Sequence, residues 1–562
     1  MQSDNILEIE NLSVGFGGRH VVEGLSLSLR RGETLGIVGE SGSGKSVSSL
    51  SLMGLLPATA TVSGHAWLAG KGKEEPPVDL LSLGEEELRR IRGQRISMIF
   101  QEPMTSLNPS KRCGQQVEEM LLLHEQVSRS EAKERVLQLF NEVMLPRPEN
   151  IYNSYPHEIS GGQKQRVMIA MALICSPDII IADEPTTALD VTVQKAILDL
   201  LRTLQQRRGM AVIFITHDLG VIAQLAHRVA VMYKGHMVEE GLASEVLYHP
   251  QHPYTKGLLA CRPPLDSRPR RLPTVASFLD GETSQPEVSH DARISHVGED
   301  AQPLLRVRNL RVEYALERSL TGRVKKSLNA VDGISFDIFK GETLGLVGES
   351  GCGKSTLGRA LLRLIDTADG TIEYNGVRLD TMTVRQMRQL RTKLQIIFQD
   401  PYSSLNPRIT VGEAILEPLR IHNIGNDASE RIMQVKTLME QVGLPADSFN
   451  RYPHEFSGGQ RQRVCIARAL VLKPELVVCD ESVSALDVSV QAQVLNLLSD
   501  LKEQYGFTCL FITHDLSVVK FISDRIMVMR QGRIVEQGES DELYAHPQEE
   551  YTRSLLDAIP RL

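Results

Sequence analysis

The sequence has no apolar run that is long enough to cross a membrane. Runs such as Ala211–Ile215 stop far short of the roughly 20 residues that a spanning helix needs. The N-terminal residues do not pass from charged to apolar to small side chains, so we expect no secretory signal. Any membrane role is therefore expected to come through a partner.

Closely spaced cysteines and clustered positive charges are also lacking. The seven cysteines are far apart and include no C-x-x-C pair. Neither a zinc site nor a disulfide framework is indicated, and a reduced cytoplasmic protein is expected. The net charge is -8, with Lys and Arg scattered along the chain, which provides no surface suited to nucleic acid. What the chain does have is 41% hydrophobic and 23% charged residues, a composition typical of packed globular domains.

Two segments of the chain carry the same landmarks in the same order, which indicates an internal repeat. Gly39–Ser46 returns at Gly348–Ser355 with a single change, and Ser160–Gln163 returns at Ser457–Gln460. The offset between the copies is 309 at Gly39 but 298 at Gln101, so the first copy has 11 extra residues before its glutamine. We expect these residues to enlarge a polar turn between two strands, at Gly70–Pro77.

The repeat favours two large domains in a chain of 562 residues. We predict a first domain over residues 1–265, a linker over 266–303 and a second domain over 304–562. The linker is predicted from its prolines, mixed charge and weak apolar periodicity. Within each copy, short apolar runs such as Thr34–Val38 alternate with helical stretches such as Val193–Gln206. This alternation predicts an α/β fold with a mostly parallel sheet covered by helices.

The most specific motif is a phosphate-binding loop in each copy. The pattern G-x-x-x-x-G-K-[ST] places backbone N–H groups around a phosphate, a lysine against its charge and a hydroxyl on Mg²⁺. Lys45 with Ser46, and Lys354 with Ser355, fill these positions. A buried strand is expected before each loop and a helix after it, which is the context that the motif requires.

Each copy also has an apolar strand that ends in two acids, Asp183-Glu184 and Asp480-Glu481. The first acid can hold the hydration shell of Mg²⁺, and the second can polarise an attacking water. Such a pair is more often only a solvated strand end. Its position behind a phosphate loop in both copies favours the catalytic interpretation.

One histidine in each copy, His217 and His514, follows a further apolar strand. This position is the carboxyl edge of the sheet, where α/β proteins bind ligands. A single histidine there is usually structural. Its recurrence alongside the acids favours a sensor of the γ-phosphate.

A Ser-Gly-Gly-Gln signature, at Ser160–Gln163 and Ser457–Gln460, precedes each two-acid strand. A serine hydroxyl and glycine N–H groups that open a helix form an anion site suited to a γ-phosphate. With this signature the chain resembles the ATP-binding cassette (ABC) ATPases over residues 7–265 and 304–559. The resemblance implies two P-loop cassettes, each with a mostly parallel sheet core, an antiparallel β subdomain and a helical signature subdomain.

In this family each ATP is held between the phosphate loop of one domain and the signature of the other, so the resemblance implies two shared sites for ATP and Mg²⁺. The implied catalytic residues are Gln101, Glu184, His217, Gln399, Glu481 and His514, and the implied metal ligands are Ser46, Gln101, Asp183, Ser355, Gln399 and Asp480. The implied nucleotide-binding residues are Gly39, Ser41, Gly42, Gly44, Lys45, Ser46, Val47, Gly348, Ser350, Gly351, Gly353, Lys354, Ser355, Thr356, Ser160, Gly161, Gly162, Gln163, Ser457, Gly458, Gly459, Gln460, Phe16 and Tyr314. The last two would stack on adenine, although core aromatics at strand ends fit the sequence nearly as well.

More narrowly, Gln101–Pro109 and the tail His249–Thr255 resemble the importers of oligopeptides, dipeptides and nickel chelates, and the second copy echoes both. The resemblance implies an ATPase that powers uptake of peptides, or of a related small nutrient, at the cytoplasmic face of the bacterial inner membrane. Two transmembrane permease subunits and a solute-binding protein are the implied partners. Several members hold an iron–sulfur cluster after this tail, but Cys261 stands alone there, so no cluster is expected.

The segments after Gln101 and Gln399 are predicted to form the docking cleft for the permease. Met104, Leu107, Tyr402 and Leu405 would lie in two exposed turns suited to receiving an amphipathic helix. Plain surface turns are the alternative interpretation.

The competing function is that of a soluble twin-cassette ATPase acting on ribosomes, since such proteins also fuse two cassettes without spanning helices. They usually carry a long, charged, helical linker, which the proline-containing segment before residue 304 does not provide. A DNA-repair cassette ATPase would need zinc-binding cysteines, and these are absent from the sequence.

Overall fold

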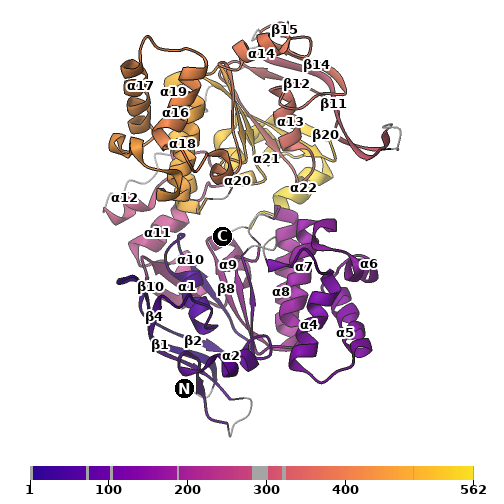
Figure 1. Ribbon diagram of the computed structural model, residues 1–562, viewed down its shortest axis with the longest axis vertical. Helices are drawn as coiled ribbons and strands as arrows, with labels where there is room; N and C mark the ends of the chain where they lie inside the picture. The colour runs from indigo at the N-terminus through magenta and orange to yellow at the C-terminus, as the bar shows by residue number, and fades with distance from the viewer. Residues whose placement is uncertain are drawn as a thin grey trace. The chain divides into compact units, whose positions relative to one another are not determined.

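The computed structural model describes residues 4–70, 75–101, 106–186, 189–280, 302–318, 324–484 and 486–560. The chain divides into two compact units (Figure 1). The first consists of Met1–Leu259, Val275–Glu282 and Pro560–Leu562, and the second of Ala260–Thr274 and Thr283–Ile559. Ala260–Thr274, which follows the first repeat in the sequence, is thus part of the second unit. The predicted domain and linker boundaries remain predictions.

The central sheet of the first unit has six strands in the order β10-β9-β3-β8-β7-β6. Its strands are β3 (Thr34–Val38), β6 (Ile96–Ile99), β7 (Ile179–Asp183), β8 (Ala211–Thr216), β9 (Arg228–Tyr233) and β10 (His236–Leu242). All pairs are parallel except β9–β10. Every residue of β3, β7 and β8 is buried, as is usual for parallel strands covered on both faces. Side chains of these strands share one core with those of the antiparallel sheet of the same unit. The predicted parallel sheet is confirmed.

A second, antiparallel sheet of the first unit has the order β2-β1-β4-β5. Its strands are β1 (Asn5–Phe16), β2 (Arg19–Arg30), β4 (Ala60–Leu68) and β5 (Val78–Asp79). Strands β4 and β5 pair on either side of the enlarged polar turn predicted at Gly70–Pro77, of which residues 71–74 lie outside the described part of the chain.

The helices of the first unit include a group that carries the signature. The group consists of α4 (Cys113–His124), α5 (Arg129–Glu142), α6 (Pro148–Asn153) and α7 (Gly161–Leu173). The other helices are α1 (Lys45–Leu52), α2 (Glu85–Ile91), α8 (Val191–Arg208), α9 (Leu219–Leu225), α10 (Ala243–Tyr248), α11 (Pro253–Ala260) and α12 (Val275–Leu279). Helix α8 contains the stretch that the sequence predicts to be helical.

The second unit repeats this plan, with sheet orders β16-β17-β18-β13-β19-β20 and β12-β11-β14-β15. The strands are β11 (Pro303–Arg318), β12 (Val324–Phe339), β13 (Thr343–Val347), β14 (Asp369–Tyr374), β15 (Val377–Arg378), β16 (Leu394–Ile397), β17 (Leu476–Asp480), β18 (Thr508–Ile512), β19 (Arg525–Arg530) and β20 (Arg533–Glu539). The helices are α13 (Lys354–Leu361), α14 (Val384–Leu390), α15 (Pro401–Ser404), α16 (Val411–Ile421), α17 (Ala428–Gln441), α18 (Gly458–Leu470), α19 (Val488–Tyr505), α20 (Leu516–Ile522), α21 (Ser540–Ala545) and α22 (Glu550–Asp557).

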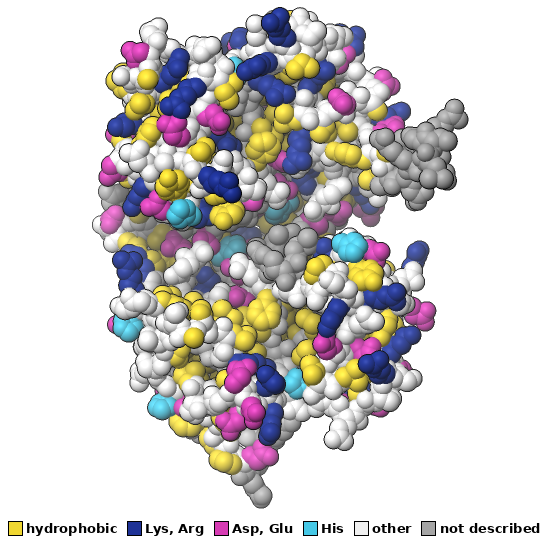
Figure 2. Space-filling model, viewed as in Figure 1, with side chains coloured by type: hydrophobic (Ala, Val, Ile, Leu, Met, Phe, Trp, Pro, Cys, Tyr) yellow, Lys and Arg dark blue, Asp and Glu magenta, His cyan; other side chains and the backbone are white. Residues whose placement is uncertain are grey.

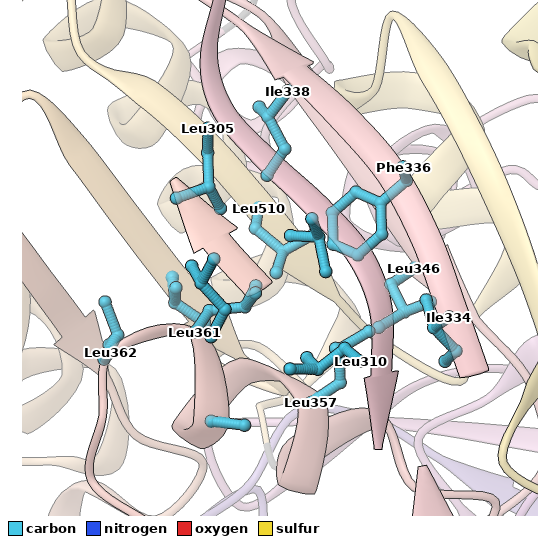
Figure 3. Packing of buried hydrophobic residues seen from close by; sticks show 14 of the residues in the cluster. Leu305, Leu310, Ile334, Phe336, Ile338, Leu346, Leu357, Leu361, Leu362 and Leu510 are labelled. Atoms are coloured by element: carbon cyan, nitrogen blue, oxygen red, sulfur yellow. The ribbon is translucent and has the colours of Figure 1, made fainter. Parts of the chain in front are cut away.

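A hydrophobic core joins the two sheets of the second unit. Leu305 and Leu310 of β11, Phe336 of β12 and Leu510 of β18 point toward one another around α13 (Figure 3). All four side chains are buried. This packing fixes the antiparallel sheet against the strand and helix that flank the phosphate loop.

Charged side chains of both signs are interspersed on the face of the molecule shown in Figure 2. Among the described residues, no helix has both the length and the apolar character needed to cross a membrane.

Candidate functional site

The two phosphate loops join a buried strand to a helix, as the motif predicts. Lys45 opens α1 and is only 4% exposed; its ammonium donates to the carbonyls of Gly39 (2.7 Å) and Glu40 (2.8 Å). Lys354 does the same in the second unit, donating to the carbonyls of Gly348 and Glu349. The loop's own carbonyls therefore fix a buried positive charge beside backbone N–H groups, which is the arrangement that receives a phosphate.

Glycine is required at the start of each loop because the chain turns against a neighbouring strand. Gly39 has φ 152°, and a Cβ there would lie 2.2 Å from the carbonyl oxygen of Met232. Gly348 has φ 151°, with the corresponding distance to Met529 being 2.1 Å. No real Cβ approaches an oxygen so closely, so any side chain would displace the loop from the strand.

The carboxyl ends of the parallel strands bring the predicted acids, glutamine and histidine together in the first unit. The Gln101 amide donates to the Glu184 carboxylate at 3.0 Å, and His217 Nδ1 lies 3.3 Å from the other carboxylate oxygen. The Ser46 hydroxyl donates to Asp183 Oδ1 at 3.0 Å. One carboxylate therefore faces the phosphate loop, while its neighbour faces the glutamine and histidine.

The same cluster occurs in the second unit with its own residues. Gln399 donates to Glu481 at 2.8 Å, His514 Nδ1 lies 3.4 Å from Glu481, and Lys354 Nζ lies 4.0 Å from it. The Ser355 hydroxyl donates to Asp480 at 2.7 Å. In both units, a glutamine and a histidine contact the glutamate, and a serine hydroxyl donates to the aspartate.

Both glutamates have a left-handed backbone conformation, with φ 46° at Glu184 and at Glu481. This conformation is unfavourable for residues with a side chain, and costs about 1–3 kcal/mol. The backbone N–H groups donate to the carbonyls of Ile215 and Ile512 on the neighbouring strands, which stabilises the turn. The strain, present at the same place in both units, turns each glutamate side chain away from the strand and toward its glutamine.

Burial and charge shift the pKa values of the acids in opposite directions. Burial raises the pKa of Asp183 and of Asp480, and the serine hydrogen bonds only partly offset it. Burial also acts to raise the pKa of Glu481, but the His514 hydrogen bond and the charges of His514 and Lys354 outweigh it, so this pKa lies below its usual value. Glu481 is therefore ionised at neutral pH and able to accept a proton.

The residues at the aspartates fit a magnesium ion. Ser46 with Asp183, and Ser355 with Asp480, present a hydroxyl and a carboxylate oxygen to one another, and hard oxygen ligands are those that Mg²⁺ prefers. The aspartates are buried, at 5% and 1% exposure, so a cation would relieve the cost of their charge. Among the described residues, no group of three or more His, Cys, Asp or Glu forms a metal cage; one or two carboxylates with phosphate oxygens are the usual Mg²⁺ ligands.

Each signature serine begins a helix and leaves the helix N-terminus exposed. Ser160 caps α7: its hydroxyl accepts from the Gln163 N–H, and the Gln163 side chain accepts from the Ser160 N–H. Ser457 and Gln460 form the same capping box on α18. The helix dipole and the exposed N–H groups there suit an anion.

The remaining predicted nucleotide residues lie in or near the loops and at strand ends. Ser41, Gly42, Ser350 and Gly351 are exposed, whereas Gly44, Val47, Gly353 and Thr356 are buried or half-buried. Phe16, at the end of β1, is half-buried and packs against the core of the first unit. Tyr314 of β11 is 44% exposed. Stacking of these two aromatics on adenine remains a prediction.

The predicted docking turns need a correction. Leu107 and Leu405 are 1% and 3% exposed, so they pack inward and offer nothing to a partner. Residues Pro401–Ser404 form the short helix α15 rather than a plain turn, because Asp400 accepts from the N–H groups of Tyr402 and Ser403. Tyr402 is 63% exposed, as predicted. Met104 lies outside the described residues.

One tyrosine in each tail, Tyr254 and Tyr551, contacts the phosphate loop of its unit. The Tyr254 hydroxyl accepts from the Glu40 N–H at 3.0 Å, and the Tyr551 hydroxyl accepts from the Glu349 N–H at 3.3 Å. Tyr254 is fully buried, and burial raises the pKa of Tyr551 to about 12. The signal for this role was the recurrence of Tyr-Thr in both tails.

Replacing Tyr254 or Tyr551 by Phe should weaken ATP binding at the loop that it contacts. The change leaves a loop N–H without its acceptor, a loss of about 1 kcal/mol or roughly fivefold in affinity. Binding titrations with ATP measure it, and Tyr248→Phe, at a 59% exposed position, is the control. Unchanged affinity in both loop variants would exclude the role.

Comparison with known proteins identifies the family to which both repeats are similar. The family model described as "ABC transporter" matches residues 22–187 and 331–484, and that described as "Oligopeptide/dipeptide transporter, C-terminal region" matches 238–286 and 535–562. The glutathione import ATP-binding proteins GsiA of Escherichia coli (strain K12) and of Shigella dysenteriae serotype 1 (strain Sd197) are each 48% identical over 572 residues, covering 100% of this chain and 90% of theirs. A solved dimeric ATP-binding cassette bound to ADP and Pi is 26% identical, covering 42% of this chain and 98% of its own, with a TM-score of 0.39.

Proposed function

Because this chain belongs to the ATP-binding cassette transporter family and is the ATP-hydrolysing subunit of an importer, we propose that it powers the uptake of peptides, and of glutathione in particular, through separate permease subunits. The observation that supports hydrolysis most is the convergence of a glutamine and a histidine on one glutamate in each unit. Peptide as the solute rests on the transporter C-terminal region and on the names of the relatives. The names of the matched family models and relatives refer to transport and import, and none refers to ribosomes.

In the proposed reaction the glutamate is the general base. Glu184 and Glu481 accept the proton of the attacking water. Gln101 and Gln399 donate to these carboxylates, and are therefore close enough to help orient that water. The loop lysines exchange their bonds to loop carbonyls for bonds to the phosphates. Mg²⁺, held by Ser46 and Asp183 or by Ser355 and Asp480, would neutralise charge on the phosphate oxygens.

The histidine acts on the γ-phosphate and on the base. His514 is close enough to hydrogen-bond Glu481, and although burial acts to lower its pKa, the glutamate raises it overall. A protonated imidazole there can orient the carboxylate and donate to a phosphate oxygen. His217 is at the same distance from Glu184 within 0.1 Å, so we assign it the same role.

Each ATP-binding site would be completed by the signature of the other unit. Ser160–Gln163 and Ser457–Gln460 open helices whose first N–H groups suit an anion. We propose that ATP draws the loop of each unit to the signature of the other within one chain. Residues after Gln101 and Gln399 would then move with the nucleotide, and the exposed Tyr402 is the described residue best suited to contact a permease helix.

In this function the protein lies at the cytoplasmic face of the bacterial inner membrane, bound to two permease subunits that receive solute from a solute-binding protein. Proteoliposomes that contain the chain with its copurifying permease should take up labelled glutathione or dipeptides when ATP is inside and the binding protein outside. Tyr402→Glu should reduce uptake by about a hundredfold or more while ATP still binds, since an unpaired buried charge in the docking contact costs about 3–5 kcal/mol. Tyr248→Glu is the exposed control.

Two results would contradict this function. One is copurification with ribosomes and no permease. The other is ATP turnover that is indifferent to every peptide-binding protein tested. Normal uptake with Tyr402→Glu would remove only the docking assignment.

A further inference from the structure

A segment that follows the first repeat in the sequence is bound along helix α20 of the second unit. Here it is called the strap, residues Leu265–Leu272. The Lys520 ammonium donates to the Leu265 carbonyl, and the Arg268 guanidinium donates to the carbonyls of Phe521 and Ser523. All these residues belong to the second unit. Figure 1 shows α20 and α19, the helices against which the strap lies.

The far end of the strap is fixed to α19 by a reciprocal pair of hydrogen bonds. The Leu272 N–H donates to the Asn496 side chain at 2.9 Å, and the Asn496 amide donates back to the Leu272 carbonyl at 2.8 Å. Leu272 is 3% and Asn496 4% exposed. Such a buried, fully satisfied amide pair specifies one register of the strap.

Arg268 occupies the carboxyl end of α20. Its side chain is 14% exposed and lies 3.9 Å from the Asp524 carboxylate. The last carbonyls of a helix have no partner within the helix, and the helix dipole places partial negative charge there. A guanidinium that donates to two of these carbonyls therefore stabilises the end of α20 and fixes its position.

The other end of α20 adjoins the proposed catalytic cluster. Asp515 caps the helix, accepting from the Ser517 N–H at 2.8 Å, and His514 immediately precedes this cap. The Tyr544 hydroxyl donates to the Leu516 carbonyl in the first turn. A seven-residue helix spans about 10 Å, so the contacts of Arg268 and Lys520 reach His514 through one short, rigid element.

The first unit lacks the side chains that make these contacts. Counting 297 residues back, Lys520 corresponds to Ala223, Asn496 to Asp199, Asp524 to His227 and Tyr544 to Leu247. Where the strap lies in the second unit, the first has a cavity of 180 Å³, lined by residues that include Gln205, Gln224 and His227. Helix α9, which follows His217, therefore has none of the corresponding side-chain anchors.

We infer that the strap is a positioning element for His514, acting through α20, and that the two ATP sites are consequently unequal. Arg268 and Lys520 are its positioning residues. Both histidines contact their glutamates, but only the helix that follows His514 is also held at its far end by the strap. This inference rests on the proposed role of the histidines in hydrolysis.

Trapping of nucleotide by vanadate, measured separately in each half, tests the inference. The probe is photoreactive 8-azido-ATP, and a protease site inserted after Gln285 separates the halves. Arg268→Ala should lower vanadate-dependent labelling of the second half about tenfold, because a misplaced group loses orientation, and leave the first half unchanged. Labelling without vanadate, which reports binding, should stay the same in both halves.

Three further variants keep the test decisive. Lys520→Met should act in the same direction while keeping an apolar stem, and Arg268→Lys should restore part of the trapping. Arg270→Ala is the control, since Arg270 and its partner Glu503 are 74% and 66% exposed. Equal loss in both halves, or loss of binding together with trapping, would overturn the strap's role. Absence of trapping in the unmodified chain would instead overturn the proposed hydrolysis, and the inference with it.

Discussion

ATP turnover should fall about 10²–10⁴-fold when Glu184 and Glu481 are both replaced by Gln, because the change removes the general base in each unit. Glutamine has nearly the same size, so the amide can keep the contact to Gln101 or Gln399 that the carboxylate makes. ATP binding should persist, since Lys45 and Lys354 are untouched. Phosphate release and equilibrium ATP binding, measured on the same preparation, separate the two effects.

The single variants and a control make this prediction specific. Glu142→Gln removes a carboxylate that pairs with Arg208 on the surface and should leave turnover unchanged. A Glu184→Gln or Glu481→Gln variant with undiminished turnover would show that its own site does not hydrolyse ATP. Loss of binding in the double variant would show that the carboxylates serve binding rather than chemistry.

The sequence was sufficient to predict the strands and loops that place the chemistry. The phosphate-loop strands and the strands that end in acids are continuous apolar runs between turn signals, which is typical of buried parallel strands. Each motif occurs in both copies of the repeat, which makes a chance match improbable. The signature serines also agree with their structure, because Ser-x-x-Gln is a local capping box that involves only four residues.

Contacts between distant residues could not be predicted in the same way. The Tyr254 hydroxyl meets a loop N–H 214 residues away, and Asn496 meets Leu272 across 224 residues. No periodicity in the chain signals such pairs. The strap has only two apolar side chains besides its one proline, and further prolines flank it, so its sequence resembles a free linker, although side chains of α19 and α20 bind it.

The prediction that the docking segments are exposed was wrong for their two leucines, because their burial also depends on contacts that local sequence does not reveal. Leu107 and Leu405 stand between polar and proline residues, a pattern typical of surface turns. Both are buried nevertheless, because a leucine beside a turn can fold back onto its own unit. Tyr402 stays outside, with its ring 5.1 Å from the Arg461 guanidinium.

ATP should strongly increase the formation of a disulfide cross-link between the phosphate loop of one unit and the signature of the other. Ser41 and Gly458 are both exposed, and a Cβ at Gly458 would meet only Leu486, at 4.0 Å. All seven native cysteines are buried, so cysteines introduced at these two positions should react first. The Glu184→Gln, Glu481→Gln background retains bound ATP and should keep the two units closed.

The cross-linking yield in this Ser41→Cys, Gly458→Cys chain is the measurement that tests most directly whether both units of one chain share each ATP. We expect a low yield without nucleotide and, with ATP and Mg²⁺, a cross-link within single chains in most of the protein. Replacing Lys45 by Ala should suppress the rise at this site. A yield independent of ATP, or cross-links that form only between chains, would show that the two units of one chain do not share each ATP.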